Sequence, residues 1–439
     1  MLHRQLTQSI SESLADTPVV LLHGARQTGK STLMRSLAGA DARYVTLDDA
    51  TVLSAVRQDP AGFLAANAGR LLIDEVQRAP ELFLAMKHEV DLARMAGQPT
   101  NGRPINRLQV NGRFLLSGSA NVLLLPRLAD SLAGRMEIHT LWPLSQSEMR
   151  VTESQKPANF IDALFAPGIA ASEAGAQRSG LTFNTTDRTE LITQLLAGGY
   201  PEAVARTSEK RRTAWFDAYL QTIVQRDIRD IAQIDGSVQM PQLLTALAHK
   251  ATGTLNAADV SRTLGLPQTT LKRYLHLLQT VFLITPLPAW TPRASHRAQK
   301  SPKLFFNDSG LMAHLLGLSA RPLISAAGLP GPLLETFVHA ELQKQCAWAS
   351  TACELMHYRT STGIEVDFIA QDRQGRVVGI EVKSSTQASA NDFKGLRHLR
   401  DIVGEQFYRG IVLHPGKESI AFDPQLASVP LGALWATEV

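Results

Sequence analysis

The stretch Val-Val-Leu-Leu-His-Gly-Ala-Arg-Gln-Thr-Gly-Lys-Ser-Thr at residues 19–32 decides the fold of the N-terminal part of the chain. Its apolar first part predicts a buried strand, and residues 24–31 fit the phosphate-binding pattern G-x-x-x-x-G-K-[ST]. The glycines allow backbone N–H groups to close around phosphates, and the helix expected from Lys30 directs its positive end toward them. The stretch therefore predicts a nucleotide-binding P-loop; the alternative is a glycine turn in another kind of α/β domain.

The side chains of this loop have separate roles in nucleotide chemistry. Lys30 is expected to reach the β- and γ-phosphates, and the Ser31 hydroxyl is expected to bind Mg²⁺. The residues expected to bind ATP are Gly24, Arg26, Gln27, Thr28, Gly29, Lys30, Ser31 and Thr32. ATP and Mg²⁺ are therefore the predicted cofactors.

A second apolar run, at residues 71–73, ends in the two carboxylates Asp74 and Glu75. After a P-loop, Asp74 is expected to hold Mg²⁺ through water, and Glu75 is expected to polarise the attacking water. Acids also follow apolar runs at ordinary strand ends, so the interpretation depends on the preceding P-loop. Together the two motifs predict ATP hydrolysis, with Lys30 and Glu75 as catalytic residues.

Two further strand-like segments, at residues 44–48 and 112–121, accompany these motifs. An inserted strand beside a catalytic glutamate is the arrangement of additional-strand P-loop ATPases, so we expect this α/β fold over residues 1–150. The polar end of the later segment carries Ser117, Ser119 and Asn121, where such enzymes place a sensor of the γ-phosphate or the lytic water. We expect Ser119 to be catalytic, although any of the three could instead cap the next helix.

Composition excludes several classes of protein. The 439 residues have room for two to four domains, and a hydrophobic content of 44% with a mean hydropathy of -0.06 indicates a soluble protein with buried cores. The sequence has no apolar stretch long enough to span a membrane and no signal pattern at its start. Cys346 and Cys353 are too few for a disulfide scaffold or a zinc site, although a bridge between them stays open. We therefore expect a cytoplasmic protein without a membrane partner.

Charge permits nucleic-acid binding without requiring it. The chain has 44 Lys and Arg against 40 Asp and Glu, which gives a net charge of +4 and a pI near 9.1. The basic residues gather within residues 206–229 and 293–303. Such runs are usually solvated faces, but the second lies where a DNA-binding hairpin is expected.

The middle of the chain predicts two regions. Residues 151–240 comprise a linker or insertion up to residue 187 and a helical part with a long amphipathic helix over 209–231. Residues 241–324 predict a winged helix, with a helix–turn–helix followed by strands at 282–284 and 303–306. The side chains expected to contact DNA are Thr269, Lys272, Arg273, Arg293, Arg297 and Lys300. Such modules also mediate protein contacts, so a purely structural role is the alternative.

Residues 325–439 predict a third domain, which carries a second set of acids. A helix holds Glu335 and Glu341, and a β-hairpin holds Asp367, Glu381 and Lys383. Alternation along the strand places Glu381 and Lys383 on one face, where the other acids could converge. Carboxylates around Mg²⁺ with one lysine can hydrolyse a phosphodiester. Charges also alternate on many exposed hairpins, and the pattern leaves open which helical glutamate completes the cluster.

The chain resembles prokaryotic AAA-type ATPases that join an N-terminal ATPase domain, a winged-helix middle and a C-terminal DUF4143 domain. The resemblance rests on the P-loop, on residues 72–75, 114–119, 131–135, 198–202 and 219–228, and on Glu381-Val382-Lys383. It implies that the C-terminal domain is similar to PD-(D/E)xK nucleases and Holliday-junction resolvases, with a restriction-endonuclease-like α/β fold that either cuts DNA or only binds it. It also implies an arginine finger, Arg135 or alternatively Arg226, that acts on its own or a neighbouring γ-phosphate.

These observations lead to one main functional hypothesis and two alternatives. The main hypothesis is an ATPase that couples hydrolysis of Mg-ATP to the binding or remodelling of DNA, branched DNA included. The first alternative is an ATP-gated, metal-dependent nuclease that cuts with Asp367, Glu381 and Lys383. The second is a nucleotide-controlled switch that binds a protein partner. An arginine finger acting between subunits would require a homo-oligomer.

Overall fold

The computed structural model describes residues 3–39, 42–96, 110–120, 132–150, 157–166, 181–182, 186–228, 239–293, 295, 297, 300–326 and 328–438. Asn121 and Ser131, and nearly all of the loop expected at 96–110, lie outside the described residues. The chain forms two compact units, one of residues 1–142 with 279–282 and one of residues 143–278 with 283–439. The first unit therefore ends before the boundary expected at residue 150. The further division of the second unit into three domains stays a prediction.

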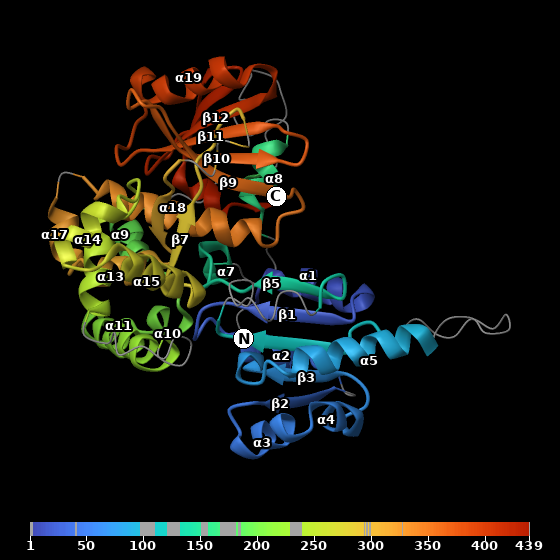
Figure 1. Cartoon of the computed structure of the whole chain (residues 1–439). Coiled ribbons are helices and arrows are strands. Elements are labelled where there is room, and N and C mark those ends of the chain that lie inside the picture. Colours follow the sequence, from blue (N-terminus) through green and yellow to red (C-terminus); the bar gives the residue numbers. More distant parts are fainter. Residues whose placement is uncertain are drawn as a thin grey trace. The chain divides into compact units, whose positions relative to one another are not determined.

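The first unit contains a five-stranded parallel sheet (Figure 1). Its strands, in spatial order, are β2 (Arg43–Thr46), β3 (Leu71–Asp74), β4 (Phe114–Gly118), β1 (Val19–His23) and β5 (Met136–Thr140). Strand β4 is inserted between β1, which leads into the P-loop, and β3, which ends in Asp74. This order confirms the additional-strand P-loop ATPase fold.

One helix precedes β1, and helices follow β1, β2 and β3, as parallel connections require. They are α1 (Leu6–Asp16), α2 (Lys30–Leu37), α3 (Ala50–Gln58), α4 (Pro60–Ala66), the short η1 (Val76–Arg78) and α5 (Leu82–Ala96). Strands β1, β3 and β4 are buried on both faces and therefore read as continuous apolar runs. Their side chains form one core with Phe83, Met86 and Val90 of α5.

The second unit begins with helices and a short hairpin. The helices are α7 (Gln146–Arg150), α8 (Phe160–Phe165), α9 (Arg188–Ala197), α10 (Pro201–Val204), α11 (Glu209–Thr222), α13 (Met240–Lys250), α14 (Ala257–Leu264), α15 (Gln268–Thr280), α16 (Ser309–Leu315) and α17 (Ala320–Ser325). Strands β7 (Ile284–Leu287) and β8 (Lys303–Phe306) pair antiparallel. The winged-helix interpretation of α13–β8 stays a prediction.

The C-terminal part of this unit is a mixed six-stranded sheet between two helices. Its strands, in spatial order, are β13 (Ile420–Asp423), β14 (Leu426–Pro430), β12 (Phe407–His414), β11 (Val377–Val382), β10 (Glu365–Asp372) and β9 (Cys353–Arg359). Alternate residues of β10 enter opposite cores: Phe368 packs with α18 (Gly331–Cys346), and Ile369 packs with α19 (Lys394–Val403). Figure 1 shows α18 and α19 on opposite sides of the sheet.

Three local expectations need correction. Strand β7 starts at residue 284 rather than 282, because Phe282 has a left-handed φ of 59° and closes the end of α15. The expected helix over 209–231 is α11 up to Thr222 and a π-helical turn over Ile223–Asp227. The expected linker over 151–187 contains α8, which the tertiary structure recruits into the core against α18.

A buried network holds residues 144–146 to helix α18 and to the turn after α9. The Lys344 ammonium donates to the carbonyl oxygen of Leu144 (2.9 Å) and to Glu341 Oε1 (2.8 Å). Glu341 Oε2 accepts the backbone N–H of Gln146 at 2.9 Å, and the Glu341 side chain is fully buried. The Leu144 N–H donates to the carbonyl of Gly199, where a Cβ would lie only 2.2 Å from the Leu144 oxygen. Glycine at residue 199 and the Glu341–Lys344 pair are therefore parts of one junction.

None of the helices within the described residues is long and apolar enough to cross a membrane.

We expect Glu341→Ala to destabilise the second unit by about 3–5 kcal/mol, because it leaves the buried Lys344 ammonium without its carboxylate. Urea unfolding followed by circular dichroism measures this change. Glu405→Ala, at an exposed position, is the control and should change stability by less than about 0.5 kcal/mol. An equal loss of stability in both variants would contradict the role of the network.

Candidate functional site

The predicted P-loop lies between β1 and α2, as the sequence indicates. A Cβ at Gly24 would lie 2.2 Å from the carbonyl oxygen of Leu141, so this position requires glycine. Gly29 has a left-handed φ of 96° and precedes the first residue of α2. The loop therefore has the tight turn that brings successive backbone N–H groups toward one point.

Lys30 is held inside the loop. Its ammonium donates to the carbonyl oxygens of Gly24 (3.0 Å) and Ala25 (2.8 Å), and only 5% of the residue is exposed. The buried Thr28 hydroxyl donates to Ala25 as well, at 3.0 Å, so this side chain shapes the loop. Phosphate oxygens are stronger acceptors for an ammonium than carbonyls, so Lys30 fits its predicted role in binding ATP.

Asp74, the last residue of β3, lies among hydroxyl donors. Ser117 donates to its Oδ1, Tyr44 donates to its Oδ2 at 2.7 Å, and Ser31 also hydrogen-bonds to it. Burial raises the pKa of Asp74, but these three hydrogen bonds and the Lys30 charge outweigh burial and hold the pKa below its usual value. Asp74 is therefore ionised at neutral pH.

The contact between Ser31 and Asp74 brings the two predicted Mg²⁺ ligands together. A Mg²⁺ ion here would take its other oxygen ligands from phosphates and water, as it usually does at nucleotide sites. The donor set fits that ion. Among the described residues, no group of three or more His, Cys, Asp or Glu side chains is arranged to hold a metal by itself.

Glu75 is held by two polar side chains at the same edge of the sheet. Its Oε2 accepts from the Ser119 hydroxyl at 3.1 Å and from the Gln77 amide, and the same amide donates to Ser119 at 2.9 Å. Because β3 and β4 are parallel neighbours, the residues after their carboxyl ends meet. The sequence did not predict a site role for Gln77 or Tyr44. For Gln77, the only signal was its position two residues after Glu75.

Ser117 and Ser119 have different partners. The Ser117 side chain is fully buried against Asp74, whereas Ser119 contacts Glu75 and Gln77. Ser119 thus lies beside the predicted catalytic carboxylate. Arg26 is half-buried, and Gln27 and Thr32 are exposed on the loop and on α2.

Arg135 lies at the opposite end of the sheet from the P-loop. It precedes β5, whose first residue, Met136, pairs with the first residue of β1, and the P-loop follows the last residue of β1. Five strand residues place the two ends roughly 13 Å or more apart. The Arg135 guanidinium instead forms a two-pronged ion pair with Asp91, at 2.6 and 3.0 Å. This corrects the expectation that Arg135 reaches its own γ-phosphate; action on a neighbouring subunit stays a prediction.

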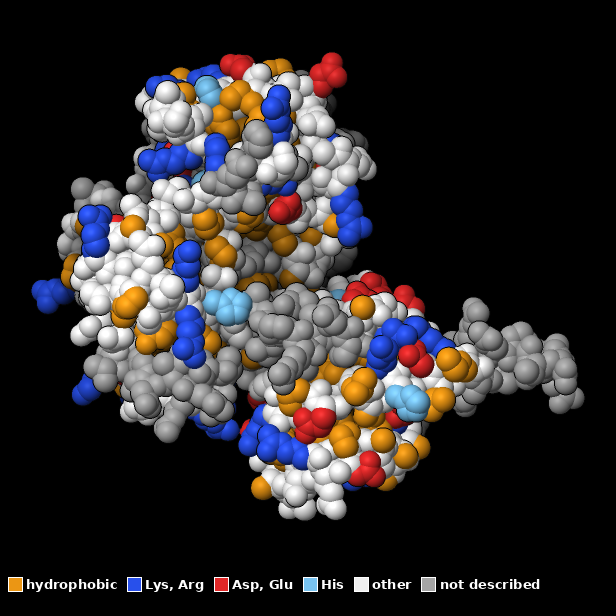
Figure 2. Space-filling model, viewed as in Figure 1, with side chains coloured by type: hydrophobic (Ala, Val, Ile, Leu, Met, Phe, Trp, Pro, Cys, Tyr) orange, Lys and Arg blue, Asp and Glu red, His pale blue; other side chains and the backbone are white. Residues whose placement is uncertain are grey.

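The residues expected to contact DNA divide into two groups. Thr269, Lys272 and Arg273 are exposed on α15, and Arg293 is exposed after β7. Arg297 and Lys300 are engaged with the C-terminal sheet: Arg297 donates to Glu354 (3.1 Å) and Gln371 (2.7 Å), and Lys300 donates to the Arg359 carbonyl (3.3 Å). These contacts argue against Arg297 and Lys300 as parts of an extended wing. On the face in Figure 2, Lys and Arg side chains are spread among acidic and hydrophobic ones.

The C-terminal acids converge in part as predicted. Glu381 Oε1 accepts from Lys383 Nζ at 2.7 Å, so the two share a face of the sheet. Asp367 on β10 accepts the Val382 N–H through Oδ2 at 2.9 Å. Burial, and to a smaller extent the nearby Asp367 charge, raises the pKa of both Glu335 and Glu381 to about 8. Glu335 is therefore the helical acid of this cluster, because Glu341 lies in the junction with Lys344.

Lys303 also belongs to this cluster, although the sequence did not predict it there. Its Nζ lies 3.4 Å from Asp367 Oδ1, and its side chain is 3% exposed. The sequence placed Lys303 in the basic segment of the wing, because charge alone does not show that every residue of β8 is buried.

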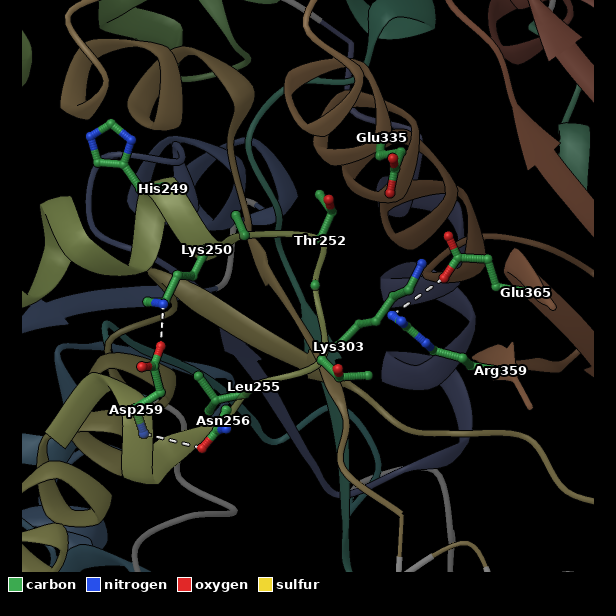
Figure 3. Close-up of a pocket in the computed structure, with 13 residues that line it drawn as sticks. His249, Lys250, Thr252, Leu255, Asn256, Asp259, Lys303, Glu335, Arg359 and Glu365 are labelled. Carbon is green, nitrogen blue, oxygen red and sulfur yellow. Dashed lines mark hydrogen bonds and ion pairs between the residues drawn. The ribbon is translucent and has the colours of Figure 1, made fainter. Parts of the chain in front are cut away.

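A cavity of about 410 Å³ opens beside this cluster (Figure 3). Lys303, Glu335, Glu365 and Arg359 line it from β8, α18, β10 and β9, and Lys250 lines it from the end of α13. Most of the charged groups around it are paired: Lys250 with Asp259, and Arg359 with Glu365 at 3.5 Å. Glu335 accepts a hydrogen bond from Thr252 in the same wall.

Comparison with known proteins supports the family resemblance. Residues 16–150 match the AAA domain model, residues 188–322 match the domain of unknown function DUF8612, and residues 330–434 match the domain of unknown function DUF4143. Uncharacterised proteins of Mycobacterium bovis and Mycobacterium tuberculosis are each 28% identical over 436 residues, which cover 99% of this chain and 85% of theirs. A Walker-type ATPase of Pyrococcus abyssi is similar in structure with a TM-score of 0.41 and 12% identity, over 72% of this chain and 96% of that one.

The P-loop, the strand order and the AAA match define an AAA-type P-loop ATPase domain. The chain joins this domain to a C-terminal DUF4143 domain, which confirms the ATPase and DUF4143 parts of the resemblance.

We expect the C-terminal acids to make the protein less stable as pH rises. The pKa of Glu335 is about 8 in the folded chain and about 4.3 when unfolded, so between these values the folded state binds more protons. Glu335 therefore contributes a fall in the free energy of unfolding from pH 5 to pH 8, whereas the buried His23, His339 and His357, whose pKa values are lowered, contribute a rise over part of this range. Glu335→Gln, which stays neutral, should reduce that fall by about 1 kcal/mol or more. Urea unfolding at a series of pH values measures it, and an unchanged slope in the variant would exclude Glu335 as the cause.

Proposed function

We propose that the N-terminal unit binds Mg-ATP and hydrolyses it. The observation that carries this proposal is the meeting of Glu75, Ser119 and Gln77 at the same sheet edge as Asp74, Ser31 and the P-loop. The AAA match supports nucleotide use by this domain. The arrangement supplies a cation for the phosphates, oxygen ligands for Mg²⁺ and a carboxylate for water.

Each residue of this site has its own role in hydrolysis. The loop N–H groups and Lys30 bind the phosphates and stabilise negative charge on the transferred group. Ser31 and Asp74 would hold Mg²⁺, which neutralises phosphate charge when bound. Glu75 accepts a hydrogen bond from the attacking water and draws its proton, while Ser119 and Gln77 fix the direction of the Glu75 carboxylate.

We further propose that ATP hydrolysis is coupled to DNA binding through α15. This proposal is supported by the succession of three helices, α13, α14 and α15, which is typical of a helix–turn–helix module. Thr269, Lys272 and Arg273 lie exposed on α15. The contacts of Arg297 and Lys300 with the C-terminal sheet support α15, rather than the segment after β7, as the proposed contact surface. The alternative is a protein partner on the same helices, and the DNA experiment below separates the two.

We expect Glu75→Gln to bind ATP with nearly normal affinity and to hydrolyse it at least about 100-fold more slowly, because the amide cannot draw the proton of water. Lys30→Ala should lose ATP binding itself. Phosphate release and binding of a fluorescent ATP analogue measure the two steps. Normal turnover by Glu75→Gln would refute the assignment of the base.

Gln77→Ala should lower kcat by roughly tenfold and leave the KM for ATP unchanged, because Gln77 touches Glu75 and Ser119 rather than the P-loop. Steady-state kinetics at saturating Mg²⁺ separates the two constants. If Gln77 had a purely structural role, Gln77→Ala would instead lower the thermal stability or raise KM at constant kcat. Arg78→Ala, one residue along η1 and paired with Asp48, is a matched control that should retain kcat.

The coupling to DNA is tested by the ATPase rate with duplex, single-stranded and four-way-junction DNA at moderate salt. We expect stimulation by at least one of them, binding that weakens as salt rises, and loss of stimulation in a Lys272→Ala, Arg273→Ala double variant with normal basal rate. Lys417→Ala, exposed in the C-terminal domain, is the control. A rate indifferent to every DNA, or binding insensitive to salt, would favour the protein-partner switch.

A further inference from the structure

The C-terminal carboxylates do not fit a metal ion as the nuclease resemblance implies. A divalent cation at such a site needs carboxylate oxygens turned toward one point. Both oxygens of Asp367 are already engaged: Oδ1 with the Lys303 ammonium at 3.4 Å and Oδ2 with the Val382 N–H at 2.9 Å. Glu381 Oε1 is engaged with Lys383 at 2.7 Å, and Glu381 Oε2 is buried without a hydrogen-bond partner among the described residues. A metal ion at Asp367 Oδ1 would lie a few ångströms from the Lys303 ammonium, whose positive charge opposes its binding.

Lys303 comes from outside the DUF4143 domain. It is the first residue of β8, within the segment that matches DUF8612, whereas Asp367 and Glu381 lie on β10 and β11. Its side chain is 3% exposed and that of Asp367 is 8% exposed, so the pair is almost completely removed from water. Displacing the ammonium would leave a buried cation without its carboxylate, which is costly.

Restricted access is not what keeps a metal ion away from the carboxylate cluster. Lys303 and Glu335 both line the cavity of about 410 Å³, which is large enough to admit a hydrated ion (Figure 3). The carboxyl groups of Glu335 and Asp367 interact, and the Lys303 charge acts on both. The obstacle to a metal is therefore the ammonium group and not the protein wall.

We propose that the Lys303 ammonium takes the place of a divalent cation in the carboxylate cluster of Glu335, Asp367 and Glu381. The cluster is then a metal-independent ion-pair centre that fastens β8 to the C-terminal sheet. The C-terminal domain consequently does not cut DNA with a metal ion. This inference concerns the second unit and is independent of ATP hydrolysis by the first.

Binding of Mn²⁺ to the full chain without nucleotide tests the proposal, with free Mn²⁺ followed by electron paramagnetic resonance. We expect no Asp367-dependent Mn²⁺ site in the wild type at submillimolar Mn²⁺. Lys303→Met should bind Mn²⁺ about tenfold more tightly or better, since a competing positive charge a few ångströms away is removed. The gain should vanish in the Lys303→Met, Asp367→Asn double variant.

Lys250→Met is the matched control, because Lys250 lines the same cavity but pairs with Asp259 instead. It should bind Mn²⁺ as the wild type does. Asp367-dependent Mn²⁺ binding in the wild type that equals that of Lys303→Met would overturn the proposal. So would a folded Lys303→Met protein that gains no Mn²⁺ affinity.

A measurement on the wild type keeps the test independent of how Lys303→Met folds. Reductive methylation read by mass spectrometry should label Lys303 at least about tenfold more slowly than Lys250, whose side chain is 40% exposed. Millimolar Mg²⁺ or Mn²⁺ should leave the Lys303 rate unchanged. Faster labelling of Lys303 with metal, or metal-dependent DNA cleavage that Asp367→Asn abolishes, would show that a metal displaces the ammonium.

Discussion

A buried carboxylate requires hydrogen-bond donors that replace water, and three buried acids of this protein, Asp74, Asp367 and Glu341, each have such donors. Asp74 receives three hydroxyl groups, and Asp367 receives an ammonium and a backbone N–H. Glu341, fully buried in α18, has Lys344 and the Gln146 N–H. The donors come from segments far apart in sequence, so each buried acid also fixes how those segments pack.

The position of β4 in the sheet brings hydrogen-bond donors to the acids beside the P-loop. Because β4 lies between β1 and β3, its carboxyl end delivers Ser117 to Asp74 and Ser119 to Glu75. The same strand order places the P-loop of β1 beside them. The acid predicted to bind a metal and the acid predicted to activate water thus adjoin in sequence but have different partners.

The sequence predicted the elements of the site better than their partners. The P-loop, the strand ending in Asp74 and the hairpin of Asp367 and Glu381 follow from local patterns of apolar, glycine and charged residues. The position of Arg135 after the sensor strand predicts an arginine finger for its own or a neighbouring γ-phosphate, but parallel register puts Arg135 at the other end of the sheet from the P-loop of its own chain. Arg297 and Lys300 looked like a solvated wing, but they bond to the C-terminal sheet.

By itself the sequence determined the P-loop, the apolar strands and the class of the N-terminal domain, because backbone turns and strand burial depend on neighbouring residues. Only the tertiary structure decided that Gln77 supports Glu75, that Glu335 rather than Glu341 joins the C-terminal acids, and that Lys303 lies among them. The pairings of the C-terminal acids join residues distant along the chain, and Gln77, although only two residues from Glu75, is also bonded to the distant Ser119. A buried charge selects its partner by which segments pack against it. No local pattern contains that information.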